Sequence, residues 1–188
     1  MFPLTIPNLL TVARILLVPV VVVALLDGSP HGDTLAAVVF AVASVTDMVD
    51  GRLARARDSI TTFGKLMDPL ADKLLIIAAL MALVSLGRVA AWVAMVIVAR
   101  EFCVTAMRMA AAQAGVVMGA GAFGKAKTVT QVAMVMALIA VRGHPAWITV
   151  LVDVSVAVTV LSGADYAFGL RRRLERARRR QTSAAPTA

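Results

Sequence analysis

Charged, aromatic and cysteine residues are all scarce in this sequence. Of its 188 residues only 16% are charged and 5% aromatic, whereas 60% are apolar. Soluble domains are about 45–50% apolar and about 25% charged, and a chain of this size exposes much of its surface. The scarcity of charge therefore excludes a soluble globular enzyme, and the apolar excess excludes a disordered chain. The single cysteine, Cys103, excludes an intramolecular disulfide.

The apolar residues fall into six segments, and a helix that spans a bilayer needs about 20 residues. The segments are Leu9–Leu26, Leu35–Arg55, Phe63–Leu86, Val89–Ala114, Lys125–Val141 and Ala146–Leu170. They predict an all-α integral membrane bundle of six transmembrane helices. A short N-terminal segment, Phe2–Asn8, precedes the first helix and is expected to lie along the membrane interface. We expect one membrane domain over residues 1–170 and a basic tail over residues 171–188 whose end is disordered.

Most of the net charge of +8 lies in one place. The run Arg171–Arg180 holds seven Arg and one Glu, so it contributes +6. This distribution favours an anchor against anionic lipid headgroups over a nucleic-acid site. With the N-terminus inside, 17 of the 19 Lys and Arg lie toward the inner side, and only Arg88 and Arg142 lie in outer turns. The positive-inside rule therefore predicts that both termini are cytoplasmic.

Four aspartates lie within 26 residues on the inner parts of the second and third segments: Asp47, Asp50, Asp68 and Asp72. The first two are spaced i, i+3 and the last two i, i+4, so each pair shares a helix face. An acid inside a span costs about 2.5–3.5 kcal/mol, so the cluster needs cationic compensation. Carboxylate oxygens suit Mg²⁺, Mn²⁺ or Ca²⁺, and four carboxylates can bridge two ions.

The residues beside these acids suit a phosphate substrate. Gly51 leaves room for a ligand near the backbone, and Ala54 places only a small side chain on the next helical turn. Arg55 has a guanidinium group that can donate two hydrogen bonds to phosphate oxygens. An ion-transport pathway is the alternative, because intramembrane acids also line such routes. The clustering at one inner end argues against it, since Asp153 is the only acid deep in the outer half. Pairing with Arg142 is the one role we can suggest for Asp153.

The pattern Asp47-x-x-Asp50-Gly51-x-x-Ala54-Arg55, eight residues, then Gly64-x-x-x-Asp68-x-x-x-Asp72 resembles the signature of the CDP-alcohol phosphotransferases. Further segments, including Asp68–Lys73 and Gly124–Gln131, resemble the phosphatidylglycerophosphate synthases of that family. The resemblance implies a six-helix enzyme over residues 1–170, a homodimer in the bacterial plasma membrane with its active site facing the cytoplasm. Cardiolipin synthases and phosphatidylinositol-phosphate synthases remain alternatives within the family. A membrane prenyltransferase fits the aspartate spacing less well.

The resemblance also implies roles for single residues. The metal ligands would be Asp47, Asp50, Asp68 and Asp72, holding two Mg²⁺ ions or Mn²⁺, with Asp72 also the general base. CDP-diacylglycerol would be bound by Gly51, Ala54, Arg55, Thr61, Asn8 and Thr11. The expected reaction is attack by the 1-hydroxyl of sn-glycerol 3-phosphate on the phosphorus that bears the diacylglycerol, with release of CMP.

Cations near the inner ends of the fourth and fifth segments could bind the phosphate of that acceptor. These are Arg100, Arg108, Lys125 and Lys127. The alternative for each is a boundary side chain that snorkels to the interface. We expect Glu101 to pair with Arg100 or Lys73 and to hold the shape of the site.

Overall fold

In a computed structural model of the chain, the structure describes the backbone of residues 6–57, 62–113, 122–143 and 145–183. Side chains are described for residues 12–46, 73–113, 123–143, 145–173 and 175. These ranges contain helices and short turns but no strand, so the predicted all-α class is confirmed. The helices are α1 (Ile6–Leu26), α2 (Pro30–Arg57), α3 (Thr62–Ser85), α4 (Ala91–Gln113), α5 (Ala122–Ala140) and α6 (Ala146–Ser183).

The helices follow the six apolar segments, and the largest differences are at the start of α2 and the end of α6. α2 begins at Pro30 because Ser29 caps it: the Ser29 Oγ accepts a hydrogen bond of 3.0 Å from the Gly32 N–H. Proline also suits the first position of a helix. α6 continues beyond Leu170 to Ser183 as one long helix that includes the basic run. The end of the tail, for which we expect disorder, lies mostly outside the described residues.

Two stretches of the described chain are long and apolar enough to cross a membrane, Phe123–Ala140 and Ala146–Arg173. Two more, Val12–Leu26 and Lys73–Ser85, are apolar but shorter. Large apolar side chains are exposed on the outside of the bundle, and examples are Leu16, Val23, Met95, Val150 and Phe168. A soluble protein rarely exposes so many of them, whereas lipid covers such a surface without cost.

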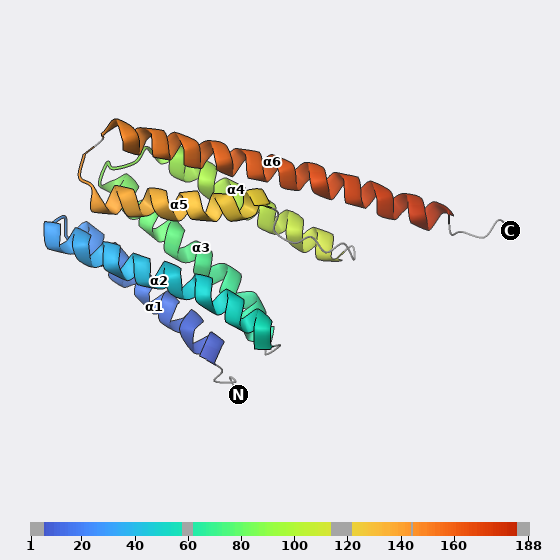
Figure 1. The fold of residues 1–188 in the computed structure, drawn as a ribbon, viewed down its shortest axis with the longest axis horizontal. Coiled ribbons are helices and arrows are strands. Elements are labelled where there is room, and N and C mark those ends of the chain that lie inside the picture. Colours follow the sequence, from blue (N-terminus) through green and yellow to red (C-terminus); the bar gives the residue numbers. More distant parts are fainter. Residues whose placement is uncertain (1–5, 58–61, 114–121, 144, 184–188) are drawn as a thin grey trace.

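Figure 1 shows α1, α2 and α3 grouped on one side and α4, α5 and α6 on the other. α1 contacts α2 and α3, and α6 contacts α4 and α5; the groups are joined by contacts of α5 with α2 and α3 and of α4 with α3. The short turns after α1, α3 and α5 lie at one end, on the left of Figure 1, which we call the turn end. The last turns of α2 and α4 lie at the other end, the motif end, where the two groups diverge.

A large apolar core fills the half of the bundle nearer the turn end. Its fully buried side chains include Leu25 on α1, Phe40 on α2, Leu80 on α3, Ile97 on α4, Leu138 on α5 and Ile148 on α6. A smaller cluster lies nearer the motif end between α4 and α6, and it comprises Val104, Ala111, Tyr166 and Leu170. Among the described side chains, the larger of the two apolar clusters therefore lies toward the turn end.

The turn end is joined by an ion cluster of Asp33, Arg88 and Arg142, the Asp33 cluster. The Arg88 Nη2 donates to both carboxylate oxygens of Asp33 at 2.8 Å, and the Arg142 Nε donates to one of them at 2.6 Å. Further donors of the two arginines reach backbone carbonyl oxygens, those of Ile139 at 3.2 Å and Gly28 at 2.7 Å. The cluster thus connects the three turns.

The suggested pairing of Arg142 with Asp153 is wrong. Arg142 lies in the turn before α6 and extends sideways to Asp33 and Gly28. Asp153 is exposed, and it lies about two helical turns further along α6. The two residues are close in sequence, but the nearer acid in space comes from α2.

Candidate functional site

The two halves of the aspartate motif lie on consecutive helices that run in opposite directions. Positions 47–55 belong to the last turns of α2 and positions 64–72 to the first turns of α3. Only residues 58–61 separate these helices, so both halves lie at the motif end (Figure 1). The side chains of the predicted ligands lie outside the described residues: Asp47, Asp50, Gly51, Ala54, Arg55, Asp68 and Asp72. The same holds for Asn8 and Thr11 on α1, and Thr61 lies outside them entirely.

The helical backbone at these positions supports the spacing argument for a metal site. Asp47 and Asp50 share one face of α2, while Asp68 and Asp72 share one face of α3. Four carboxylates and no Cys or His form a set of hard oxygen donors, which suits Mg²⁺ or Mn²⁺. The donor chemistry and the backbone placement therefore fit a divalent metal.

A second ion cluster, the Glu101 cluster, joins α4 to α5 and α6. The Glu101 Oε1 accepts a hydrogen bond from the Arg100 Nη1 at 3.1 Å and forms an ion pair with Lys127. The Arg100 Nη2 also donates to the Ser162 Oγ at 2.9 Å. Lys127 and Glu101 are buried, 7% and 9% exposed. Counting only the residues whose side chains the structure describes, the cluster holds two cations and one carboxylate, a net charge of +1.

The Glu101 cluster decides between the two pairings predicted for Glu101. The pairing with Arg100 is confirmed, and the second partner is Lys127. Lys73, which directly follows Asp72 on α3, lies within electrostatic range of Lys127. The cluster is therefore electrostatically linked to the helix that carries the second half of the motif.

The other two predicted phosphate-binding cations, Arg108 and Lys125, are exposed. The Arg108 guanidinium lies over the ring of Tyr166, 5.7 Å from its centroid. Within the described part of the chain, no carboxylate pairs with either cation. Thus the structure brings Arg100 and Lys127 together around Glu101, and it leaves Arg108 and Lys125 open to solvent.

Polar residues on α6 were not anticipated from the sequence. Ser162 binds Arg100, and the Thr159 Oγ1 accepts a hydrogen bond of 3.0 Å from the Gln131 Nε2 of α5. The buried polar side chains of α6 are Ser155, Thr159, Ser162 and Tyr166. Their spacing of i, i+4, i+7 and i+11 within an apolar helix was the available signal, because it marks one polar helix face.

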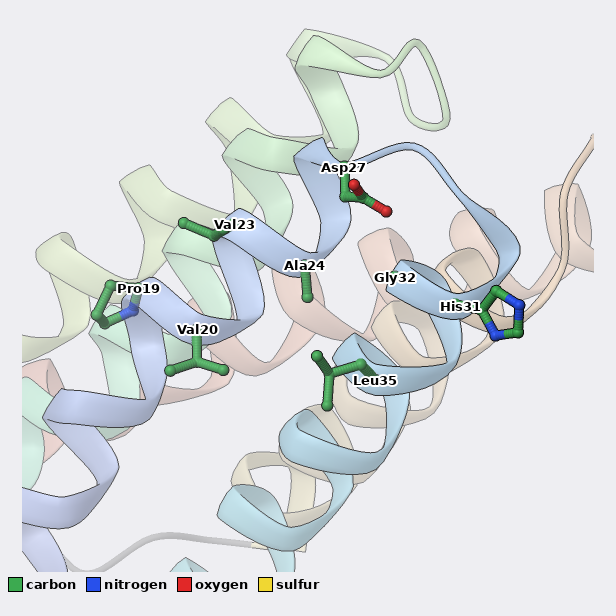
Figure 2. A pocket seen from close by; sticks show the side chains of 8 residues that line it. All are labelled: Pro19, Val20, Val23, Ala24, Asp27, His31, Gly32 and Leu35. Atoms are coloured by element: carbon green, nitrogen blue, oxygen red, sulfur yellow. The ribbon is translucent and has the colours of Figure 1, made fainter.

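A surface cavity of about 600 Å³ lies between α1 and α2 near the turn end (Figure 2). Its lining residues are Pro19, Val20, Val23, Ala24, Asp27, His31, Gly32 and Leu35. The helices approach closely here, since a Cβ on Gly32 would overlap the carbonyl oxygen of Ala24. This cavity is mostly apolar and lies at the opposite end from the motif, so it is not the site of phosphate chemistry.

The sequence model of the CDP-alcohol phosphatidyltransferase family matches residues 4–161. The match covers both halves of the motif and the Glu101 cluster except Ser162. The chain belongs to the CDP-alcohol phosphatidyltransferase family and is a transferase. Membership in this family removes the ion-transport and prenyltransferase alternatives.

Several bacterial relatives indicate the branch of the family. A CDP-diacylglycerol–glycerol-3-phosphate 3-phosphatidyltransferase of Bacillus subtilis is 41% identical over 145 residues, 71% of this chain and 75% of that protein. A probable phosphatidylglycerophosphate synthase of Mycobacterium tuberculosis is 37% identical over 85% of this chain and 78% of its own length. A cardiolipin synthase (CMP-forming) of Streptomyces coelicolor is 40% identical over 52% of this chain and 47% of its own length.

Proposed function

We propose that this enzyme transfers the phosphatidyl group of CDP-diacylglycerol to sn-glycerol 3-phosphate, giving phosphatidylglycerophosphate and CMP. The single observation that carries the proposal is the cation set on α4 and α5, of which Lys127 lies within electrostatic range of Lys73, the residue after Asp72. Arg100 and Lys127 leave a net positive charge around Glu101, and Arg108 and Lys125 are open cations. A small soluble dianion is the acceptor that such a set favours. The names of the relatives support the same reaction.

In the proposed mechanism, the carboxylates of Asp47, Asp50, Asp68 and Asp72 hold two divalent ions, Mg²⁺ or Mn²⁺. Ions held by these carboxylates would supply the positive charge that neutralises the pyrophosphate and stabilises the leaving oxygen of CMP. Asp72 would accept the proton of the acceptor 1-hydroxyl as the hydroxyl oxygen bonds to the phosphorus and the bond between that phosphorus and the CMP oxygen breaks.

The remaining motif residues bind the nucleotide lipid in this proposal. The small residues Gly51 and Ala54 leave room for the CDP group, and Arg55 binds its phosphate oxygens. The polar residues Asn8, Thr11 and Thr61 bind the same substrate from α1 and from the connection between α2 and α3. The acceptor phosphate is bound by Arg100, Arg108, Lys125 and Lys127.

We also infer the placement of the enzyme in the membrane. All six helices cross the bilayer, both termini lie in the cytoplasm, and the motif end faces the cytoplasm. The apolar exterior and the two clear spans support a membrane location. The acyl chains of CDP-diacylglycerol then stay in lipid while the soluble acceptor arrives from the cytoplasm. A homodimer is expected from the family.

The decisive experiment measures CMP release by the purified enzyme with Mg²⁺ and CDP-diacylglycerol. Glycerol 3-phosphate, inositol phosphate and phosphatidylglycerol are offered in parallel, and we expect turnover with glycerol 3-phosphate alone. The relative named as a cardiolipin synthase makes phosphatidylglycerol the second candidate acceptor. Turnover with phosphatidylglycerol alone would establish that function instead.

The role of Asp72 is tested in the same assay. Asp72→Asn should lower the turnover at least about 100-fold, because an amide cannot accept the proton. Asp153→Asn is the matched control, since Asp153 is an exposed acid on α6. Full CMP release by the Asp72→Asn enzyme would disprove the assignment of the base.

A further inference from the structure

Two arginines of α4 are oriented by side chains of α6. Arg100 donates to the Ser162 Oγ at 2.9 Å, and its side-chain stem passes over Gly163. A Cβ built on Gly163 would lie 3.3 Å from the Arg100 Cγ and 3.8 Å from its Nε. The absence of a side chain at position 163 is therefore part of how Arg100 fits against α6.

Arg108 is oriented by the next turn of α6. Its guanidinium lies over the ring of Tyr166, 5.7 Å from the centroid. Tyr166 is 8% exposed and packs in the cluster with Val104 and Leu170, so its ring is fixed. A fixed ring under an open guanidinium restricts where that guanidinium can point.

The two contacts form one continuous surface. Arg100, Val104 and Arg108 are spaced i, i+4 and i+8 on α4, so they share one face, and Val104 packs with Tyr166. Along the α4 axis the two arginines are about 12 Å apart, at 1.5 Å per residue. The side chains of Ser162 and Tyr166 lie opposite them on α6. We call the set Ser162, Gly163 and Tyr166 the α6 platform.

We propose that the α6 platform consists of positioning residues that set the acceptor affinity of this enzyme. The inference rests on the proposed function, in which Arg100 and Arg108 bind the phosphate of glycerol 3-phosphate. A guanidinium held in place loses less conformational entropy when it binds a phosphate. The platform therefore lowers the KM for the acceptor without touching either substrate.

The chain offers conservative variants and matched controls for a test. Ser162→Ala removes the hydrogen bond to Arg100, and Gly163→Ala crowds the stem of that arginine, whose Cγ would lie 3.3 Å from the new Cβ. Tyr166→Leu removes the ring beneath Arg108. Ser155→Ala is the control for Ser162→Ala, because the Ser155 Oγ is buried on α6 and has no hydrogen-bond partner in the described chain. Tyr166→Phe keeps the ring and removes a hydroxyl that likewise lacks a partner among the described residues.

The readout is the full set of kinetic constants of the full-length enzyme. We expect Ser162→Ala, Gly163→Ala and Tyr166→Leu each to raise the KM for glycerol 3-phosphate about three- to tenfold. The kcat and the KM for CDP-diacylglycerol should stay within about twofold of wild type. Tyr166→Phe and Ser155→Ala should keep the wild-type acceptor KM. Loss of packing alone would lower the active fraction, and hence kcat, without this selective rise.

One further variant separates this inference from the function on which it rests. Arg108→Ala should raise the acceptor KM more than Tyr166→Leu does. If Arg108→Ala raises it and none of the three platform variants does, the platform proposal is wrong and the acceptor site stands. If Arg108→Ala and Lys125→Ala both leave the acceptor KM unchanged, the proposed acceptor site itself is wrong. Ser162→Ala removes only one hydroxyl group and should fold normally. Its acceptor KM therefore still tests the proposal if the Tyr166→Leu enzyme does not fold.

Discussion

The Asp33 cluster and the Glu101 cluster have the same composition, one carboxylate and two cations, yet they differ in how fully their polar groups are paired. At the turn end, Arg88 donates to both oxygens of Asp33 and Arg142 to one of them, and both arginines also donate to backbone carbonyl oxygens. In the Glu101 cluster, Arg100 has a buried Nε without a partner in the described chain. The arginine donors described for the first cluster are paired with oxygen acceptors, whereas the second cluster has one buried donor that lacks a partner in the described chain.

This difference indicates different uses of buried charge. A buried charge is tolerated when its hydrogen bonds are satisfied, and then it joins elements rigidly. Both clusters have the same charge balance among the described residues, so the distinction is the unpaired donor of Arg100, which leaves the Glu101 cluster able to interact with an arriving anion. We therefore interpret the Asp33 cluster as structural and the Glu101 cluster as part of the acceptor site. The predictions below test that distinction.

The largest expected effect on stability is at the turn end. Asp33→Asn leaves Arg88 and Arg142 without their shared anion, and breaking a buried ion pair in this way costs about 3–5 kcal/mol. We expect a markedly lower Tm in detergent, and the acceptor KM at a permissive temperature should match that of wild type. A normal Tm, or a raised acceptor KM, would contradict the structural interpretation of this cluster.

A smaller loss of stability is expected for Glu101→Gln, about 1–3 kcal/mol, because Arg100 and Lys127 both contact the Oε1 of Glu101, which the amide oxygen of Gln can replace, whereas the donors of Asp33 use both of its oxygens. The acceptor phosphate can replace the lost negative charge. Glycerol 3-phosphate should therefore raise the Tm of the Glu101→Gln enzyme more than that of wild type. The control is Asp33→Asn, for which the added acceptor should raise the Tm no more than in wild type. Equal Tm increases in all three proteins would remove the distinction between the clusters.

The pH dependence of stability provides a third test of the structural role of the Asp33 cluster. Burial by itself raises the pKa of Asp33, but the hydrogen bonds and charges of Arg88 and Arg142 together lower it below the ordinary value. The stabilisation by this carboxylate is therefore complete above the unfolded pKa of Asp, about 3.9. It is lost as the pH falls through the lower folded-state pKa. The difference in unfolding free energy between wild type and Asp33→Asn should be constant above about pH 5 and shrink below about pH 4. A difference that does not change with pH would contradict the pairing.

The sequence predicted the helices and the motif well because both are local patterns. Apolar runs mark the six helices, although only two described stretches are long and apolar enough to cross a membrane, and a spacing of three residues places Asp47 and Asp50 on one helix face. It predicted the ion clusters less well, because they depend on contacts between distant segments. Asp33 is 55 residues from Arg88 and 109 residues from Arg142. Ser162 is 62 residues from Arg100, and no local pattern connects them.

The smallest expected effect concerns the turn that presents Arg88 to Asp33. The Gly87 N–H donates to the Val84 carbonyl oxygen at 3.0 Å and the Arg88 N–H to that of Leu83 at 2.9 Å, which is the Schellman end of α3. Gly87 has φ of +67°, and a Cβ there would meet nothing within 4 Å.

Gly87→Ala should therefore cost only the left-handed backbone penalty, about 1–2 kcal/mol, and lower the Tm less than Asp33→Asn does. Combining the two variants distinguishes strain from a lost contact. If Gly87→Ala acts through backbone strain alone, its effect adds to that of Asp33→Asn. If instead it moves Arg88 away from Asp33, the double variant is less destabilised than the sum, because the same ion pair cannot be lost twice. Additivity is the result we expect, since the space around position 87 allows the turn to keep its shape.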